Sequence, residues 1–181
     1  MAYKRRVIDT LLDDLLPQLP AILLDGPKAV GKTTTAVQRA KTIKRFDRPE
    51  DRLLADTNPH WALQGERPVL LDEWQRSPNV WDTVKAAVDS DFSGGQYLFT
   101  GSMPNTETHS GAGRITSIRM RPMSFAERDV AEPTVSLAKL LDGTEYLQGE
   151  TSVGLDLYCQ EMMQSGFPAL RTLKGNAHRT A

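Results

Sequence analysis

The fold is decided by Gly26-Pro27-Lys28-Ala29-Val30-Gly31-Lys32-Thr33, which reads G-x-x-x-x-G-K-T. This spacing is typical of a loop that binds phosphate groups, because its glycines let backbone N–H groups close around the oxygens. An apolar run of strand type, 21–25, precedes the loop, and a stretch without proline or glycine, 34–45, follows it and favours a helix. Strand, loop and helix is the context that the motif requires.

The loop predicts a site for a nucleoside triphosphate and a magnesium ion. Lys32 can neutralise the β- and γ-phosphates, and the Thr33 hydroxyl can ligate Mg²⁺. The alternative is a glycine-rich turn before an ordinary helix. The residues that we assign to nucleotide binding are Gly26, Pro27, Lys28, Ala29, Val30, Gly31, Lys32, Thr33 and Thr34.

A second group of polar residues follows the apolar run 68–71, where the sequence continues Asp72-Glu73-Trp74-Gln75. Asp72 at a strand end would hold Mg²⁺ through its water shell, and Glu73 would orient and deprotonate an attacking water. An adjacent acidic pair favours water as the acceptor, and the guanine-reading N-K-x-D motif is absent, so the sequence favours hydrolysis of ATP. The alternative is a polar strand end without chemistry.

Two further stretches carry candidate catalytic residues. A strand predicted over 96–102 ends in Thr100 and Ser102, and if it lies between the loop strand and the Asp72 strand, its hydroxyls would contact the γ-phosphate or its water. Arg114 follows a glycine-rich stretch and can reach a phosphate of its own site or of a neighbouring subunit. The alternatives are a capping hydroxyl and a surface ion pair.

Hydrophobic periodicity predicts the remaining elements. We expect a helix over 3–16, with one apolar stripe, and a short strand over 52–56. Basic residues predominate in 39–52, which we interpret as a solvated helix face or as a nucleic-acid contact. The other expected elements are a helix from 77 with a buried apolar face, a loop over 103–113, a last strand over 114–120, a helix over 155–163 and a frayed tail over 174–181.

Composition restricts the class of protein. The 181 residues carry a net charge of −1, so no overall field attracts nucleic acid or a membrane surface. A single cysteine, Cys159, excludes an internal disulfide, and the three histidines show no metal-site spacing. No apolar stretch is long enough to span a bilayer, so the sequence predicts a globular protein of the cytoplasm.

These motifs together resemble one family, the prokaryotic AAA-type ATPases that carry a C-terminal nuclease-like domain of uncharacterised role. The similarity runs from about residue 3 to residue 170 and rests on G-P-K-A-V-G-K-T-T, L-L-D-E-W-Q, L-F-T-G-S, H-S-G-A-G-R, R-P-M-S-F-A-E and S-G-F-P. The resemblance implies a three-layer α/β P-loop NTPase fold with an additional strand and a mostly parallel five-stranded sheet. It also implies ATP and Mg²⁺ as ligands, Thr100 or Ser102 as a sensor and Arg114 as an arginine finger.

The resemblance also sets an expected domain organisation. The family continues beyond Gly166-Phe167-Pro168 into a second domain, whereas this sequence ends at Ala181. We therefore expect an ATPase core over 1–134 and the start of a helical C-terminal segment over 135–181. Two alternatives to hydrolysis stay open. One is a nucleotide-dependent switch or scaffold that holds a protein partner, another copy of the chain or nucleic acid. The other is a kinase, for which the sequence shows no arginine-rich lid.

Overall fold

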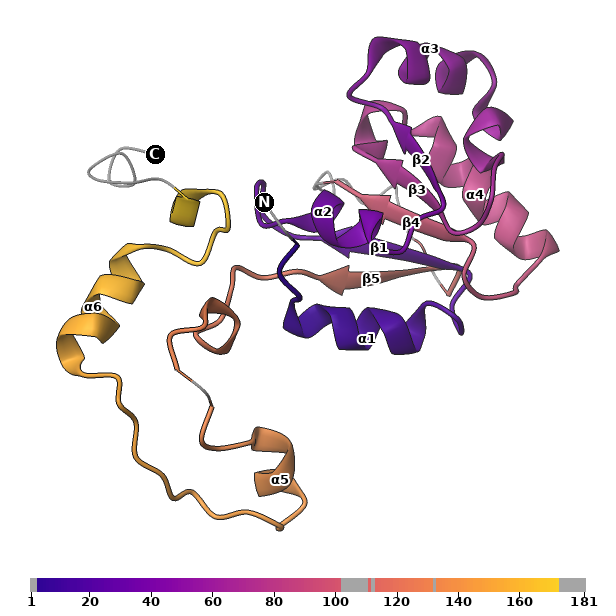
Figure 1. The fold of residues 1–181 in the computed structure, drawn as a ribbon. Coiled ribbons are helices and arrows are strands. Elements are labelled where there is room, and N and C mark those ends of the chain that lie inside the picture. The colour runs from indigo at the N-terminus through magenta and orange to yellow at the C-terminus, as the bar shows by residue number, and fades with distance from the viewer. Residues whose placement is uncertain (1–2, 102–110, 112, 132, 173–181) are drawn as a thin grey trace. The chain divides into compact units, whose positions relative to one another are not determined.

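The computed structural model describes residues 3–101, 111, 113–131 and 133–172 (Figure 1). The chain forms two compact units, Met1–Arg121 and Pro122–Ala181. The first unit contains a five-stranded sheet in the order β2-β3-β4-β1-β5, and every neighbouring pair is parallel. Its strands are β1 (Ala21–Asp25), β2 (Thr42–Arg45), β3 (Val69–Asp72), β4 (Tyr97–Thr100) and β5 (Ile115–Arg119).

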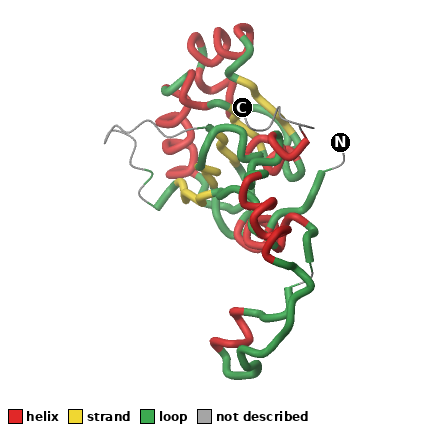
Figure 2. Tube along the Cα trace, turned by 90° about the vertical axis from the view of Figure 1, so that its left-hand side faces the viewer, coloured by secondary structure: helices red, strands yellow, loops and turns green. Residues whose placement is uncertain are grey.

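Helices cover both faces of this sheet, which gives the expected three layers (Figures 1 and 2). On one face, Leu12 and Leu16 pack with Ile22, Leu24 and other alternate strand residues. The opposite strand residues pack against α4 and the chain around α3. All three central strands are fully buried along their apolar residues, as is typical of a parallel sheet. The helices are α1 (Val7–Leu15), α2 (Lys32–Val37), α3 (Pro49–Thr57) and α4 (Asn79–Ser90).

The second strand lies elsewhere than the sequence indicated. The helix predicted over 34–45 ends at Val37, and its last four residues form β2, which pairs in register with β3. Thr42 and Ile43 are β-branched, and the pairing covers an edge of β3 that would otherwise be open. The basic residues of 39–52 therefore do not share one helix face.

The strand predicted over 52–56 is wrong for a related reason, because these residues lie within α3. Pro49 occupies the first turn of that helix, and Glu50 and Asp51 follow it there. Proline at the first helical position and acidic residues in the first turn both favour a helix start. Leu53 and Leu54 are exposed, so the apolar pair does not indicate a buried strand.

The helix predicted over 3–16 is confirmed over 7–15 as α1, whereas 3–6 are not helical, and its buried face is narrower than expected. Leu12 is fully buried and Leu16 nearly so, whereas Val7 and Leu11 are 67% and 46% exposed. The polar Asp9, in contrast, is only 1% exposed. Burial of this carboxylate reflects contacts on the polar side of α1 that hydrophobic periodicity does not detect.

The second unit contains short helices, namely α5 (Leu137–Leu141), α6 (Leu155–Met163) and single turns at Ala126–Arg128 and Leu170–Thr172. The helix predicted over 155–163 is confirmed as α6. Its Glu161 is buried and accepts ion pairs from Arg171 at 2.7 Å and Arg128 at 3.5 Å. The domain boundary expected after residue 134 stays a prediction.

Two expected segments fall outside the described residues, namely most of the loop 103–113 and the tail 174–181. None of the helices in the described part of the chain combines the length and the apolar content that crossing a bilayer requires.

Candidate nucleotide-binding site

The glycine-rich loop connects β1 to α2, as the motif predicts. Three of its residues have positive φ: Gly26 at 144°, Ala29 at 65° and Gly31 at 106°. A Cβ at Gly26 would lie 2.2 Å from the carbonyl oxygen of Met120, so only glycine fits there. Gly31 is the N-cap of α2 and is left-handed, which turns the chain into the helix. The loop is therefore a fixed turn that presents its backbone at the carboxyl end of β1.

Lys32 lies folded over this loop. Its side chain is largely buried, and Nζ donates hydrogen bonds to the carbonyl oxygens of Gly26 at 2.7 Å and Pro27 at 2.9 Å. Burial lowers the pKa of Lys32, and nearby carboxylates, with Glu73 the foremost, oppose that shift. The ammonium group is thus held close to both the loop and the acidic strand end.

Two hydroxyl groups converge on Asp72 at the end of β3. Thr33 Oγ1 donates to Asp72 Oδ1 at 2.7 Å, and Thr100 Oγ1 donates to the same oxygen at 2.5 Å. Asp72 is 5% exposed and Thr100 is fully buried. The strand β4, which carries Thr100, lies between β1 and β3, as the sequence analysis required. Three chain segments that are distant in sequence therefore meet at one carboxylate.

The donor atoms around Asp72 fit a magnesium ion. A carboxylate and a hydroxyl are hard oxygen ligands, and Mg²⁺ takes one or two of them together with waters and phosphate oxygens. Among the described residues, no cluster of three or more His, Cys, Asp or Glu could hold a metal ion by itself. The residues present thus suit a magnesium ion that arrives bound to a nucleotide. Thr33 and Asp72 would hold this ion.

Glu73 occupies an unusual backbone position beside Asp72. It is left-handed, with φ 56° and ψ 41°, which is uncommon outside glycine and turns the chain sharply after β3. Its carboxylate is half-buried, and Oε2 accepts a hydrogen bond of 2.6 Å from Nε2 of Gln75. Sparsely populated backbone conformations of this kind cluster at active sites and switch regions.

Gln75 lies beside these groups, and the sequence analysis gave it no role. Its Oε1 is buried and has no hydrogen-bond partner among the described residues. A Cβ at Gly101 would lie 2.0 Å from that oxygen, so the amide packs against the backbone at the end of β4. The amide therefore lies between the Glu73 carboxylate and the Thr100 strand end. The sequence signal that could have identified Gln75 is its position two residues after Glu73.

An aromatic cluster packs beside the ends of β3 and β4. Trp74 follows Glu73 directly and is fully buried. Its ring stacks on Trp81 of α4 with centroids 4.5 Å apart and meets Phe99 of β4 edge-on at 6.1 Å. Burial of the predicted apolar face of α4 is confirmed. The packing fixes the ends of β3 and β4 next to the residues that carry the polar groups.

Arg114 lies away from these groups. It precedes β5, whose first residue Ile115 is paired with Ala21 at the start of β1, whereas the loop follows the end of β1. Its Nε forms an ion pair of 2.6 Å with Asp89 Oδ1 on the surface, and that hydrogen bond raises the pKa of Arg114. Ser102 lies outside the described residues. The structure thus brings together Lys32, Thr33, Asp72, Glu73 and Thr100 but not Arg114.

Comparison with known proteins gives a family and two relatives. The model of the AAA domain family matches residues 18–128, which include the loop and both strand ends. Uncharacterized proteins of Mycobacterium bovis and Mycobacterium tuberculosis are each 31% identical to this chain over 140 residues. That alignment covers 72% of this chain but 31% of each relative, so the chain spans about a third of their length. No solved structure matches.

Proposed function

The chain belongs to the AAA domain family, and we propose that it binds Mg·ATP at the loop 26–33 and hydrolyses the β–γ phosphoanhydride bond. The observation that carries the proposal is the meeting of Thr33 and Thr100 on Asp72. A hydroxyl of the phosphate loop and a carboxylate of a neighbouring strand are the groups that position a nucleotide-bound Mg²⁺ in P-loop proteins. Nucleotide binding follows from the family, and hydrolysis is our inference.

Binding would begin with the loop and Lys32. The bonds of Nζ to the carbonyl oxygens of Gly26 and Pro27 would be exchanged for bonds to the β- and γ-phosphates. That exchange is favourable because both partners of an ammonium–phosphate bond are charged, whereas the carbonyl oxygens are neutral acceptors. The magnesium ion, when bound, would neutralise charge between the two phosphates. Thr33 and Asp72 would hold the ion. Thr34, in the first turn of α2, would also take part in nucleotide binding.

Hydrolysis would use the groups at the ends of β3 and β4. Glu73 would accept a proton from the attacking water, and Gln75 would fix the direction of its carboxylate through the bond to Oε2. Thr100, bonded to Asp72, would link the γ-phosphate position to the metal ligand. Ser102 follows two residues later in the sequence, and the proposal keeps it as a second candidate sensor.

Arg114 enters the proposal only as a finger that acts on the nucleotide of another copy. Its position at the start of β5 is remote from the loop of its own chain, and its surface ion pair with Asp89 leaves it accessible to a neighbour. This role requires a homo-oligomer. For the longer relatives, we propose that the region beyond the aligned third includes a nuclease-like domain.

A nucleotide-dependent switch that hydrolyses ATP negligibly is the second candidate function. It is favoured by the hydrogen bond that already occupies the Glu73 carboxylate, and by the remoteness of Arg114 from its own loop. In that case, bound ATP would hold a protein partner or nucleic acid in place. The net charge gives no indication of nucleic acid.

One experiment separates these functions. A fluorescent ATP analogue is titrated into the purified chain with and without Mg²⁺, and phosphate release is measured on the same samples. Lys32→Ala should abolish binding, whereas the matched control Lys41→Ala, an exposed lysine outside the loop, should not. Release that disappears in Glu73→Gln, with binding retained, supports hydrolysis. Binding without release in the unaltered protein supports the switch, and absence of binding refutes both.

A further inference from the structure

The segment before α1 makes a direct contact with the phosphate loop. Arg6 is 6% exposed, and its guanidinium donates from Nη1 to the carbonyl oxygen of Val30 at 3.0 Å. Its Nη2 donates to the carbonyl oxygen of Arg121, just beyond β5, at 2.9 Å. One buried cation therefore joins the loop to the chain that follows a neighbouring strand. Neither acceptor is a side chain, so the contact acts on backbone position.

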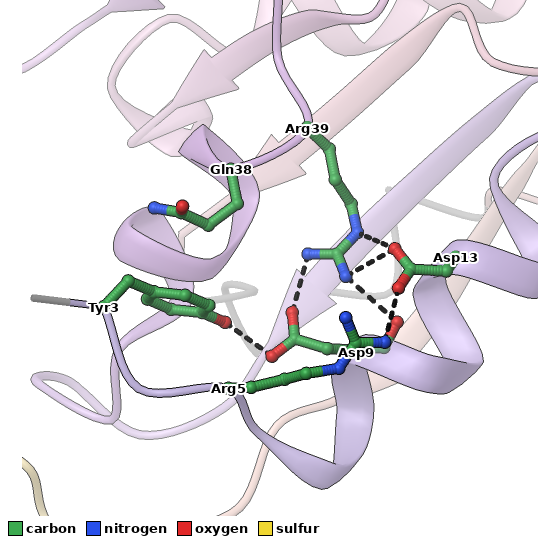
Figure 3. Close-up of a pocket in the computed structure, with 6 residues that line it drawn as sticks. All are labelled: Tyr3, Arg5, Asp9, Asp13, Gln38 and Arg39. Carbon is green, nitrogen blue, oxygen red and sulfur yellow. Dashed lines mark hydrogen bonds and ion pairs between the residues drawn. The ribbon is translucent and has the colours of Figure 1, made fainter.

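A second set of bonds ties the same segment to α2, the helix after the loop. Asp9 accepts hydrogen bonds from the Tyr3 hydroxyl at 2.6 Å and from Nη1 of Arg39 at 2.7 Å (Figure 3). It also accepts one from the backbone N–H of Arg6 at 2.5 Å. The Tyr3 hydroxyl also lies 3.1 Å from Oγ1 of Thr35 in the first turn of α2. The loop is thus held at Val30 by Arg6, and just beyond its end by Tyr3.

The carboxylate at the centre of this network is ionised over the physiological range. Burial by itself would raise the pKa of Asp9, but the hydrogen bonds from Tyr3, the Arg6 amide and Arg39 outweigh it, so the pKa lies below its ordinary value. A pocket of about 250 Å³ opens on one side of the network (Figure 3). Arg5 lines that pocket, but it points its guanidinium to Asp13 at the surface and does not contact the loop.

The loop has a physical need for such support. Ala29 has a positive φ, which is unfavourable for a residue other than glycine. Gly26 and Gly31 also have positive φ, and glycine loses much conformational entropy when it is held in one conformation. A loop that binds phosphate through its backbone loses affinity if it must first be ordered, because the ordering free energy is subtracted from binding. Bonds that fix Val30 beforehand remove part of that loss.

We propose that Arg6 is a positioning residue for the phosphate loop, and that its contacts, together with those of Tyr3 and Asp9, set the affinity of the loop for nucleotide. The inference rests on the proposed nucleotide binding, but not on hydrolysis. Arginine suits the position because its planar fork donates in two directions at once, to Val30 and to Arg121. Lysine has a single ammonium group on a flexible stem and would reach one carbonyl at a time.

The test compares Arg6→Ala, Arg6→Lys and the matched control Arg5→Ala in the full chain. Each removes or alters one arginine of the same segment, but Arg5 has a side chain that is 66% exposed. Affinity for a fluorescent ATP analogue is measured about 20 °C below the lowest melting temperature of the set, so that every variant is folded. We expect affinity to fall about 10- to 100-fold in Arg6→Ala, less in Arg6→Lys, and not in Arg5→Ala.

A purely structural role predicts a different pattern, namely a lower melting temperature with unchanged affinity. Amide hydrogen exchange of 28–33 in the nucleotide-free protein gives a second readout, and this exchange should be faster in Arg6→Ala than in Arg5→Ala. If Arg6→Ala does not fold, Tyr3→Phe replaces it, because it removes one hydroxyl and should weaken affinity about threefold or more. Unchanged affinity in the folded variant of the pair overturns the inference.

The proposed function fails in a distinguishable way. If the unaltered protein does not bind the analogue, nucleotide binding at the loop is refuted, and the inference about Arg6 is refuted with it. If the unaltered protein binds and Lys32→Ala does not, but Arg6→Ala binds as tightly as the unaltered protein, then only the positioning role of Arg6 is refuted.

Discussion

Replacing Gln75 with leucine should leave the fold stable while it changes turnover. The substitution removes a hydrogen bond of 2.6 Å to the charged Glu73 carboxylate, a loss of about 1.5–3 kcal/mol. It also removes Oε1, a buried acceptor without a partner among the described residues. Loss of this unsatisfied group should stabilise the fold by about 1–3 kcal/mol. Glu73 is half-buried, so water can solvate its freed carboxylate. The free energy of unfolding should therefore change by no more than about 1 kcal/mol.

Phosphate release at saturating Mg·ATP then tests whether Gln75 orients Glu73. A carboxylate that is free to rotate is a poorer general base, so turnover should fall about tenfold or more while nucleotide affinity is unchanged. Urea unfolding supplies the stability, and Gln64→Leu, at an exposed position, is the matched control. Unchanged turnover would refute the orienting role. A higher turnover would mean that Gln75 restrains Glu73, as the switch function requires.

Three further predictions concern the metal, the core and pH. Nucleotide affinity of the unaltered protein should fall when EDTA removes Mg²⁺, whereas Asp72→Asn should bind equally weakly with and without the ion, both measured by titration of the analogue. Trp81→Ala should lose about 3–5 kcal/mol of unfolding free energy in urea, because Trp81 packs on Trp74 and Phe99. Asp9→Asn should cost about 2 kcal/mol near pH 7, and urea unfolding should find less of that cost at about pH 3. The sign follows from the lowered pKa of Asp9: its stabilisation is complete above the ordinary value of about 4 and is lost as pH falls towards the folded value.

The sequence predicts the central strands well, because each is a short apolar run that ends in polar residues. The same reasoning fails at 34–45, where a stretch without proline or glycine has two solutions. Its last four residues become β2 because they pair with the open edge of β3, a strand that follows later in the chain. At 52–56 the sequence does contain the helix signal, because Pro49 and the two acidic residues after it mark a helix start. The prediction gave more weight to the apolar pair Leu53-Leu54, which favours a strand.

The candidate site divides in a similar way. Lys32, Thr33, Asp72 and Thr100 belong to motifs whose spacing is set by the strand ends, so their meeting could be anticipated from a parallel sheet. Arg114 could not be placed, because a residue at a strand start and a residue at a loop tip look alike in sequence. The register of β5 against β1 decides the matter, and it puts Arg114 at the end of the sheet remote from the loop.

The groups that support the site are harder to predict than the groups that bind, and the reason is sequence separation. Arg6 bonds to Val30 across 24 residues and to Arg121 across 115. Both acceptors are backbone carbonyl oxygens, which leave no mark on residue type. A ligand-binding loop can therefore be read from its own eight residues, whereas its stiffness depends on a buried arginine that resembles any other basic residue near an N-terminus. If Arg6 sets nucleotide affinity, chains with identical loops should differ in affinity according to the segment that precedes them.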